Sequence, residues 1–424
     1  MRRRMIYPAQ NEVQSLGQLT VNVRTEDGFN PINGANVSIS RTGANGTIEE
    51  LATDSSGQTP VIDLPAPPKD YSLEPNNPQP YSEYTVTVDA PGYERFIVSG
   101  TQILPDTTAI QDVPVIPQSQ TTVSALQQIL ITINPHTLYG NFPPKIPESP
   151  VKEDVEQGFI VLERPVIPGI IVVHEGPPDD PLGRNYYVPF KDYIKNVASS
   201  EIYSTWPVST IQANILVILS FTLNRVYTEW YRAKGKNFTI TNSTAYDQAF
   251  SYGRNIYRNI SAEVDALFVN YISKPGIRQP LFTQYCDGSR VECPTWLSQW
   301  GSKYLGDQGY TTLNILKNYY GQDISLSTAA RVAGIPSSFP GTNLQVGSRG
   351  SAVRTIQNQL NNISDNFPAI PKIRVDGVFG QNTKNAVQTF QRVFYLPQSG
   401  IVDYPTWYKI SDIFTAVERL AETS

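Results

Sequence analysis

One carboxylate stands out because it lies where a helix would bury it. The apolar residues Phe190, Ile194 and Val197 recur at spacings of four and three, which predicts one face of an amphipathic helix. The next position on that face holds Glu201. Burial raises the pKa of a carboxyl group, and an acid that stays protonated near neutral pH can serve as a general acid. A rim position, from which Glu201 reaches solvent, is the alternative that the pattern leaves open.

Other residues of the kind that perform catalysis are scarce. The chain has two histidines, His136 and His174, both in proline-rich stretches, and two cysteines, Cys286 and Cys293. Protein zinc sites draw three or four ligands from His, Cys and carboxylates that lie close together, so we expect no metal and no other cofactor. A Ser-His-Asp or Cys-His mechanism would have to use one of these two histidines, and we disfavour it.

The two cysteines are better placed for a disulfide than for catalysis. Cys286 and Cys293 are separated by six residues that include Asp287-Gly288, a turn signal typical of hairpins. No histidine lies nearby in the sequence to activate a thiol. We therefore expect a disulfide that closes a small loop, with a stabilisation of roughly 2–3 kcal/mol.

The composition indicates a folded protein of several domains. Its 424 residues correspond to two to four domains at roughly 100–200 residues each. Hydrophobic residues make up 40% and aromatic residues 11%, which is enough to build cores. The net charge of −5 gives no basic surface of the kind that binds nucleic acid. We expect no membrane span, because no apolar run reaches about 18 residues, and the N-terminus lacks the apolar core of a signal peptide.

Patterns along the chain divide it into a pre-segment, a β-sandwich, a proline-rich connector, a mainly helical domain with a hairpin, and a helical C-terminal unit. We expect these over residues 1–16, 17–116, 117–189, 190–335 and 340–420, respectively. The sandwich is predicted from alternating apolar and polar residues, as in Tyr84–Val88. Prolines break regular structure in the connector, where an exposed join would be cut readily by proteases. The expected fold class is multidomain α+β.

A first family resemblance lies in the C-terminal unit. Its motifs are Leu344–Ser348, Val353–Asn361, Asp376–Gly380, Phe390-Gln391 and Gly400–Asp403. Together they resemble the peptidoglycan-binding type 1 domain, which is a three-helix fold. The resemblance implies that this domain holds the protein on the cell wall.

The middle domain carries a second set of motifs, Tyr193–Ile202 with Trp206-Pro207, Leu297–Gly301, and Leu316–Gly321. These resemble the SpoIID family of lytic transglycosylases, and the first matches that family's catalytic helix. The resemblance implies that Glu201 protonates the glycosidic oxygen of a MurNAc-GlcNAc bond. It then acts as a base toward the C6 hydroxyl of MurNAc, which closes a 1,6-anhydro ring. One carboxylate suffices because the sugar supplies the nucleophile, whereas ordinary glycosidases use two.

The chain also departs from that family. Members that bind zinc have a Cys and His cluster where this chain has Thr241–Gln248, which supports the expectation of no metal. An arginine on the second helix of those proteins aligns near Leu219. The candidates for sugar contacts are Tyr246, Asp247, Gln248, Ser298, Gln299 and Trp300. Ordinary turn and cap chemistry is the alternative for these residues.

The order of the domains resembles that of spore cortex-lytic enzymes. This implies a spore-located zymogen of a lytic transglycosylase that acts on cortex peptidoglycan during germination. The implied partners are that peptidoglycan and a subtilisin-like germination protease, which would cut near Gln118–Thr121. One alternative is a non-catalytic peptidoglycan-binding spore protein, in which Glu201 is structural. Another is a hydrolytic muramidase or glucosaminidase, which needs a second carboxylate such as Asp247 or Glu229.

Overall fold

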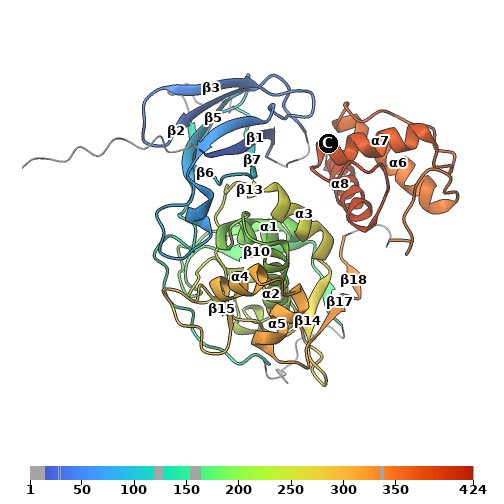
Figure 1. Ribbon diagram of the computed structural model, residues 1–424. Coiled ribbons are helices and arrows are strands. Elements are labelled where there is room, and N and C mark those ends of the chain that lie inside the picture. The colour runs from blue at the N-terminus through green and yellow to red at the C-terminus, as the bar shows by residue number, and fades with distance from the viewer. Residues whose placement is uncertain are drawn as a thin grey trace, which may run out of the picture.

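The chain folds into an N-terminal β-sandwich, a mixed middle domain and a C-terminal helical domain, coloured blue, green to orange, and red in Figure 1. The computed structural model describes residues 15–423 except 27, 29, 119–127, 153–163 and 335–338. The multidomain α+β class expected from the sequence is confirmed. Within these described ranges, no helix combines the length and apolar character that a membrane span requires.

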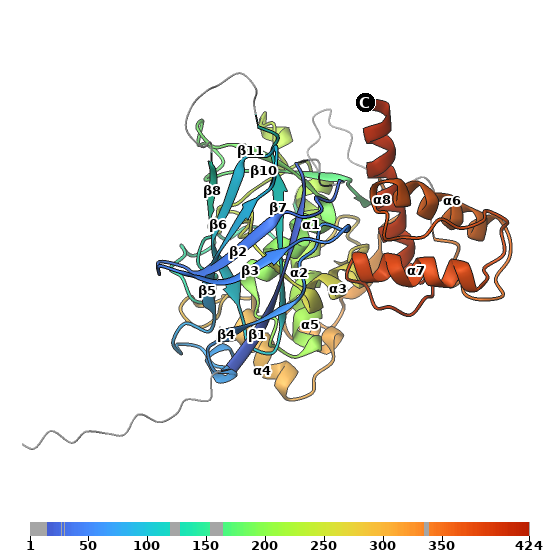
Figure 2. The same ribbon diagram turned by 90° about the horizontal axis from the view of Figure 1, so that it is seen from above.

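Alternating side chains build the core of the sandwich. Tyr84, Val86 and Val88 are fully buried, while the residues between them are partly exposed. The sheet orders are β3-β2-β5-β6-β8 and β13-β7-β1-β4, and Figure 2 shows the strands from above. The strands of the sandwich segment itself are β1 (Ser15–Thr25), β2 (Asn36–Arg41), β3 (Thr47–Ala52), β4 (Ile62–Ala66), β5 (Ser82–Asp89), β6 (Arg95–Ile103) and β7 (Thr108–Val115).

Two further strands of these sheets come from outside the sandwich segment. The connector supplies β8 (Gln128–Thr132), which pairs in parallel with β6. The middle domain supplies β13 (Ile256–Tyr257), which pairs antiparallel with β7. The sandwich is therefore hydrogen-bonded to the rest of the protein through both of its sheets.

Helices make up most of the regular secondary structure of the middle domain. They are α1 (Phe190–Glu201), α2 (Val208–Tyr227), α3 (Arg258–Leu267), α4 (Gln299–Asp307) and α5 (Thr312–Tyr320). Helix α2 is buried along most of its length and packs against the four others. This central position explains its apolar sequence, because a helix surrounded by protein has no solvent-facing side.

Short strands complete the middle domain, and one of its sheets begins in the predicted connector. Strand β10 (Ile170–His174) lies between β11 (Asn185–Pro189) and β12 (Ile240–Thr241), so the expected boundary at 189/190 follows directly after a strand of this sheet. Two further pairs are β9 (Val166–Ile167) with β18 (Arg331–Val332), and β14 (Asn270–Ser273) with β17 (Ser325–Thr328).

The hairpin expected at Asp287-Gly288 is wrong. Strands β15 (Tyr285–Cys286) and β16 (Leu297–Ser298) run parallel, so the chain makes a loop between them rather than a tight antiparallel turn. Asp287 Oδ1 accepts hydrogen bonds from the backbone N–H groups of residues 289, 290 and 291 at 2.8–3.0 Å. This side-chain capping closes the loop on itself and replaces the cross-strand bonds of a hairpin.

The C-terminal domain consists of α6 (Ser351–Asn366), α7 (Gln381–Val393) and α8 (Tyr404–Thr423). Its core includes Val353, Leu360 and Phe390, all fully buried at helical spacings. The domain contacts both others: Gln58 Nε2 of the sandwich donates to the Val393 carbonyl at 2.8 Å, and Lys191 of α1 pairs with Asp412 of α8.

Candidate active site

Glu201 is the last residue of α1 and only 3% exposed. The predicted apolar face is present, since Phe190, Ile194 and Val197 are buried on the same helix. Ile202 takes an extended backbone conformation, with φ −134° and ψ 145°, and ends the helix directly after the glutamate. The side chain of Glu201 is therefore held at the end of a rigid element, and the rim alternative does not apply.

Two neutral groups donate hydrogen bonds to the carboxylate. The backbone N–H of Ala249 donates to Oε1 at 2.7 Å, and the Tyr285 hydroxyl donates to Oε2 at 2.5 Å. A third bond fixes the backbone, because Gln299 Nε2 donates to the Glu201 carbonyl at 3.1 Å. Each carboxylate oxygen accepts one hydrogen bond here. Each therefore keeps a lone pair that can accept a further hydrogen bond or hold the proton that the acid donates.

The carboxyl group of Glu201 lines a cavity of about 390 Å³. Its lining residues include some from the predicted connector and some from the loop after β15, so segments far apart in sequence meet at the site. The cavity has the size of small-molecule pockets, about 300–1,000 Å³. Its lining residues are Thr137, Asn141, Phe142, Pro143, Pro144, Lys145, Glu201, Thr244, Tyr285, Cys286, Asp287, Arg290, Val291 and Gln299.

Burial dominates the electrostatics of Glu201. Desolvation raises the pKa of its carboxyl group, and the charge of Lys145 and the bonds from Tyr285 and Ala249 oppose that rise only in part. Burial also lowers the pKa of the Lys145 ammonium, an effect that the nearby Glu201 and Asp247 oppose. The phenol of Tyr285 has a pKa well above its usual range because it is buried beside Glu201. Tyr285 thus stays protonated and remains a hydrogen-bond donor.

Asp247 and Gln248 lie behind the cavity, both fully buried. Arg225 Nε donates to Asp247 Oδ1 at 2.8 Å, and the Tyr231 hydroxyl and Thr241 Oγ1 donate to Oδ2 at 2.7 Å. The Gln248 Oε1 accepts from the Tyr193 hydroxyl at 2.9 Å and from Thr222 Oγ1 at 2.8 Å. These bonds fix the turn that presents the Ala249 N–H to Glu201. Tyr246 is partly exposed and, like Asp247 and Gln248, is not among the residues lining the cavity.

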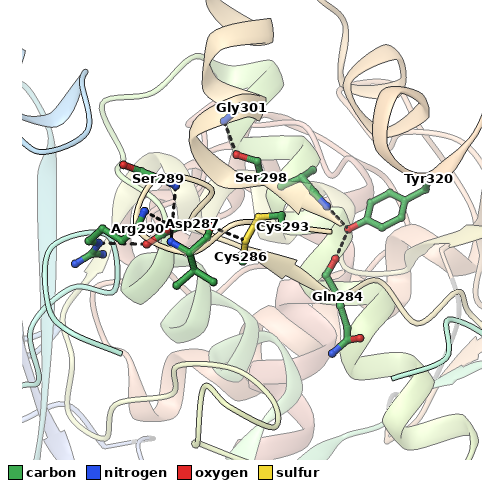
Figure 3. The surroundings of a disulfide bond; sticks show 11 residues. Gln284, Cys286, Asp287, Ser289, Arg290, Cys293, Ser298, Gly301 and Tyr320 are labelled. Atoms are coloured by element: carbon green, nitrogen blue, oxygen red, sulfur yellow. Dashed lines mark hydrogen bonds and ion pairs between the residues drawn. A yellow bond between two sulfur atoms is a disulfide. The ribbon is translucent and has the colours of Figure 1, made fainter. Parts of the chain in front are cut away.

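The motif around Ser298 has three different environments. Ser298 caps α4, because its Oγ accepts a hydrogen bond from the Gly301 N–H at 2.9 Å (Figure 3). Gln299 lines the cavity and bonds to the Glu201 carbonyl. Trp300 is 9% exposed and packs against the Trp206 ring with centroids 5.0 Å apart. Of the six predicted sugar contacts, the structure brings only Gln299 to the cavity.

Cys286 and Cys293 form a disulfide with their Cα atoms 5.8 Å apart (Figure 3). The loop that it closes carries Arg290, whose guanidinium lies beside Asp287 at 3.2 Å. No sequence pattern pointed to Arg290, Tyr285 or Lys145 as site residues. Tyr285 could have been noticed only by its position next to a cysteine, and Lys145 only as a cation after two prolines.

Among the residues that the structure describes, no group of three or more His, Cys, Asp and Glu side chains is arranged to hold a metal ion. His136 lies against Tyr203 with ring centroids 4.4 Å apart, and His174 bonds to Asn185 at 2.9 Å.

One family comparison gives a clear result. Residues 349–410 match the peptidoglycan binding domain family, so the C-terminal helices α6 to α8 carry a peptidoglycan-binding domain. This match supports a cell-wall-associated protein with peptidoglycan as a partner. It covers a small part of the chain. No curated protein sequence matches the chain.

Solved structures give only weak similarities. The Bacillus anthracis TIE protein is 18% identical over 24% of this chain and 17% of its own, with a TM-score of 0.18. The minor pilin GBS52 of Streptococcus agalactiae is 16% identical over 26% and 49%, with a TM-score of 0.18. Acinetobacter radioresistens catechol 1,2-dioxygenase is 14% identical over 29% and 59%, also at 0.18. The chain spans less than two thirds of each, and nothing about function follows from similarities this low.

Proposed function

We propose that the protein is a peptidoglycan lytic transglycosylase with Glu201 as its general acid and base. The observation that carries the proposal is the single buried carboxyl group of raised pKa at the wall of a cavity, in a chain with a peptidoglycan-binding domain. A raised pKa favours the protonated form of the carboxyl group, and general acid catalysis requires that form.

The reaction would use Glu201 twice. The protonated acid gives its proton to the glycosidic oxygen between MurNAc and GlcNAc, and the bond from C1 of MurNAc to that oxygen breaks. The carboxylate formed, which the Tyr285 hydroxyl and the Ala249 N–H stabilise, then takes the proton from the C6 hydroxyl of MurNAc. The C6 oxygen attacks C1 and closes the 1,6-anhydro ring. Glu201 ends the cycle protonated again.

The other carboxylates near the cavity favour this single-acid chemistry over hydrolysis. A hydrolase needs a second carboxylate to activate water or to attack C1. The second carboxylate lining this cavity is Asp287, whose Oδ1 accepts three backbone N–H groups and whose Oδ2 pairs with Arg290. Asp247 is fully buried and paired, and neither it nor Glu229 is among the residues that line the cavity.

The finer part of the proposal concerns the substrate and its setting. The domain order and the motifs of the middle domain are similar to those of the spore cortex-lytic enzyme SleC. On that resemblance we infer that the protein belongs to the spore, that its glycan is cortex peptidoglycan, and that a subtilisin-like protease activates it during germination. The peptidoglycan-binding domain supports the glycan as partner.

The zymogen part of the proposal places a cut near residues 118–121, of which 119–121 lie outside the described residues. Gln118 is exposed, and its Nε2 donates to the Tyr93 carbonyl at 2.8 Å. A cut there would leave β8 on the enzyme side, still available to pair with β6 of the sandwich. Strand β13 and β7 would likewise stay paired. We therefore expect the cut sandwich to remain bound until these contacts are broken.

Cortex peptidoglycan, digested with the full chain and with Glu201→Gln, tests the proposal. Each protein is used before and after limited cleavage by a subtilisin-type protease, and mass spectrometry identifies the new glycan ends. Anhydro-muramic ends from the native chain alone support the transglycosylase. Reducing ends would replace it with a hydrolase. Strands that are bound but intact with all four samples would leave a non-catalytic peptidoglycan-binding protein.

Sequencing the protease product addresses the zymogen separately. Anhydro ends that appear only after cleavage, with a new N-terminus within 118–128, support an activating cut. Full activity of the uncut chain, or a cut inside 17–116, would contradict it.

A further inference from the structure

The connector is anchored to the middle domain just before residues 141–144, which line the cavity. Arg290 donates to the backbone carbonyls of Thr137, Tyr139 and Gly140 at 2.5, 2.9 and 2.5 Å. The Thr137 N–H donates to the Ser200 carbonyl at 3.0 Å, next to Glu201. One guanidinium therefore donates hydrogen bonds to three backbone carbonyls of a segment that is neither helix nor strand. Hydrogen bonds from a charged donor are stronger than those between neutral groups.

A second anchor of the connector comes directly after residue 144. The Lys145 ammonium donates to the Asp247 carbonyl, and the Ile146 N–H donates to the Ala245 carbonyl at 2.7 Å. Glu148 then pairs with the buried Arg225 at 2.6 Å. The connector is thus fixed on both sides of a short bridge, residues 141–144.

The bridge itself faces the cavity. Asn141, Phe142, Pro143 and Pro144 all line it, and no backbone hydrogen bond of the described residues involves them. The two prolines cannot donate such bonds and hold the backbone extended. The two anchors, rather than local secondary structure, therefore hold residues 141–144 in place.

We propose that residues 141–144 form a substrate-contacting wall for an amino-sugar chain, and that Arg290 is the positioning residue that holds this wall against the site of Glu201. The inference deepens the proposed function and rests on it. Arg290 also lines the cavity, and the role proposed for it is to hold the wall through the carbonyls of Thr137, Tyr139 and Gly140.

The chemistry of the wall fits a chain of N-acetylated sugars. The Phe142 ring and the two pyrrolidine rings offer flat apolar surfaces against which the CH faces of pyranose rings pack. The Asn141 side chain offers both a donor and an acceptor for acetamido and hydroxyl groups. Pockets that combine apolar walls with a few placed polar groups are typical of small-ligand sites.

The loop that carries Arg290 is built to hold it still. The Cys286–Cys293 disulfide closes the loop, and Asp287 Oδ1 binds three of its backbone N–H groups (Figure 3). Gly288 has φ +74°, and an added Cβ there would lie 1.8 Å from Ser298 Oγ, so the loop also packs closely on β16. The disulfide therefore restrains the loop that carries Arg290, and Arg290 in turn holds residues 141–144 in position.

Hydrogen exchange of the full-length protein, read by mass spectrometry, tests the wall without catalysis. The proteins carry Glu201→Gln, and the probe is a soluble GlcNAc-MurNAc tetrasaccharide. We expect the sugar to slow exchange in peptides covering 137–146. With Arg290→Met, that segment exchanges about tenfold faster without sugar, as loss of charged hydrogen bonds implies, and sugar no longer protects it. Arg290→Lys restores part of the protection, and exposed Arg278→Met changes nothing.

Steady-state kinetics of the protease-treated proteins with intact Glu201 give the second readout. Arg290→Met raises KM about tenfold with kcat nearly unchanged, because the wall binds substrate and transition state alike. Sugar protection confined to 349–410, or native exchange of 137–146 in Arg290→Met, would overturn the inference. A wall that is protected by sugar in a protein that makes no anhydro ends would instead overturn the transglycosylase and leave a sugar-binding site.

Discussion

The pKa values of two buried carboxyl groups at helix α1 are shifted in opposite directions. Glu201 at the end of the helix is 3% exposed, and Asp265 on α3 is 2% exposed. Asp265 faces two lysines of α1, with Lys195 Nζ at 2.7 Å and Lys191 Nζ at 3.7 Å. These charges outweigh desolvation and lower the pKa of Asp265 to about 2. Glu201 is bonded to a phenol and a backbone amide instead, and burial keeps its pKa raised.

The comparison distinguishes a carboxylate that holds two helices together, Asp265, from one suited to proton transfer, Glu201. Burial is nearly equal in the two, so the charge of the direct partner decides the direction of the pKa shift. Asp265 is locked in its ionised form and ties α3 to α1. Burial favours the protonated form of Glu201, and Glu201, unlike Asp265, lines a cavity.

The largest expected effect is the loss of glycan cleavage in Glu201→Gln. Removing a general acid costs roughly 10²–10⁴-fold in rate, and release of anhydro ends from cortex peptidoglycan measures it. We expect the thermal stability of this variant to match or exceed that of the native chain, because an amide needs no desolvation of a charge. A variant that loses activity together with cooperative unfolding would show that Glu201 is structural.

We expect Asp265→Asn to lose stability and to keep its rate of glycan cleavage, which is the reverse of the result expected for Glu201→Gln. The substitution leaves Lys195 buried without its counter-charge, while Lys191 keeps its ion pair with Asp412. Breaking a buried pair costs about 3–5 kcal/mol. Denaturant unfolding measures the free energy of unfolding. Where the variant stays folded, its rate of glycan cleavage should be close to native. A stable Asp265→Asn protein would mean that Lys195 releases its proton or reaches solvent, and the contrast with Glu201 would fail.

The pH dependence of stability gives the next sharpest test, with opposite signs for the two groups. Asp265 has a lowered folded-state pKa, so its contribution is present above the unfolded value and disappears as pH falls from about 4 to about 2. That contribution is about 2–3 kcal/mol, since each pKa unit is worth about 1.4 kcal/mol. Glu201 has a raised folded-state pKa, so its contribution is present below the unfolded value and disappears as pH rises through the raised one.

Each sign is read from the difference in unfolding free energy between the native chain and one variant across pH. The native chain should lose its advantage over Asp265→Asn on the acid side. On the alkaline side it should lose stability relative to Glu201→Gln. A native chain that gains stability over Glu201→Gln as pH rises would mean that the ionised carboxylate is the favoured form.

Elements with a strong period could be predicted from the sequence. The apolar face that ends at Glu201 and the helices of the peptidoglycan-binding domain follow from spacing alone, and residues 349–410 match that domain family. The SpoIID resemblance of the middle domain and its catalytic assignment stay predictions. Strand period likewise placed the alternating β5 in a sandwich.

The partners of Glu201 could not be predicted, for physical reasons. Lys145 lies in a proline-rich stretch without periodicity, and distant residues hold the chain on both sides of the bridge. Arg290 donates to the Gly140 carbonyl before it, and Lys145 donates to the Asp247 carbonyl after it. Strand β13 has two residues, too few to show a period, and its pairing with β7 depends on the packing of two domains. The predicted hairpin failed because a carboxylate, Asp287, satisfied the turn's backbone N–H groups.

The smallest expected effect belongs to Tyr285→Phe, which alters one hydrogen bond of Glu201. The Tyr285 hydroxyl favours the ionised carboxylate, so its removal raises the pKa of Glu201 further. Activity should fall by less than about tenfold, in keeping with one hydrogen bond, and its alkaline limb should move to higher pH. Tyr320→Phe is the matched control, because the Tyr320 hydroxyl donates to the Gln284 carbonyl at 2.8 Å and has no bond to Glu201. An alkaline limb that moves equally in both variants, or downward in Tyr285→Phe, would mean that neutral donors do not set the proton affinity that distinguishes Glu201 from Asp265.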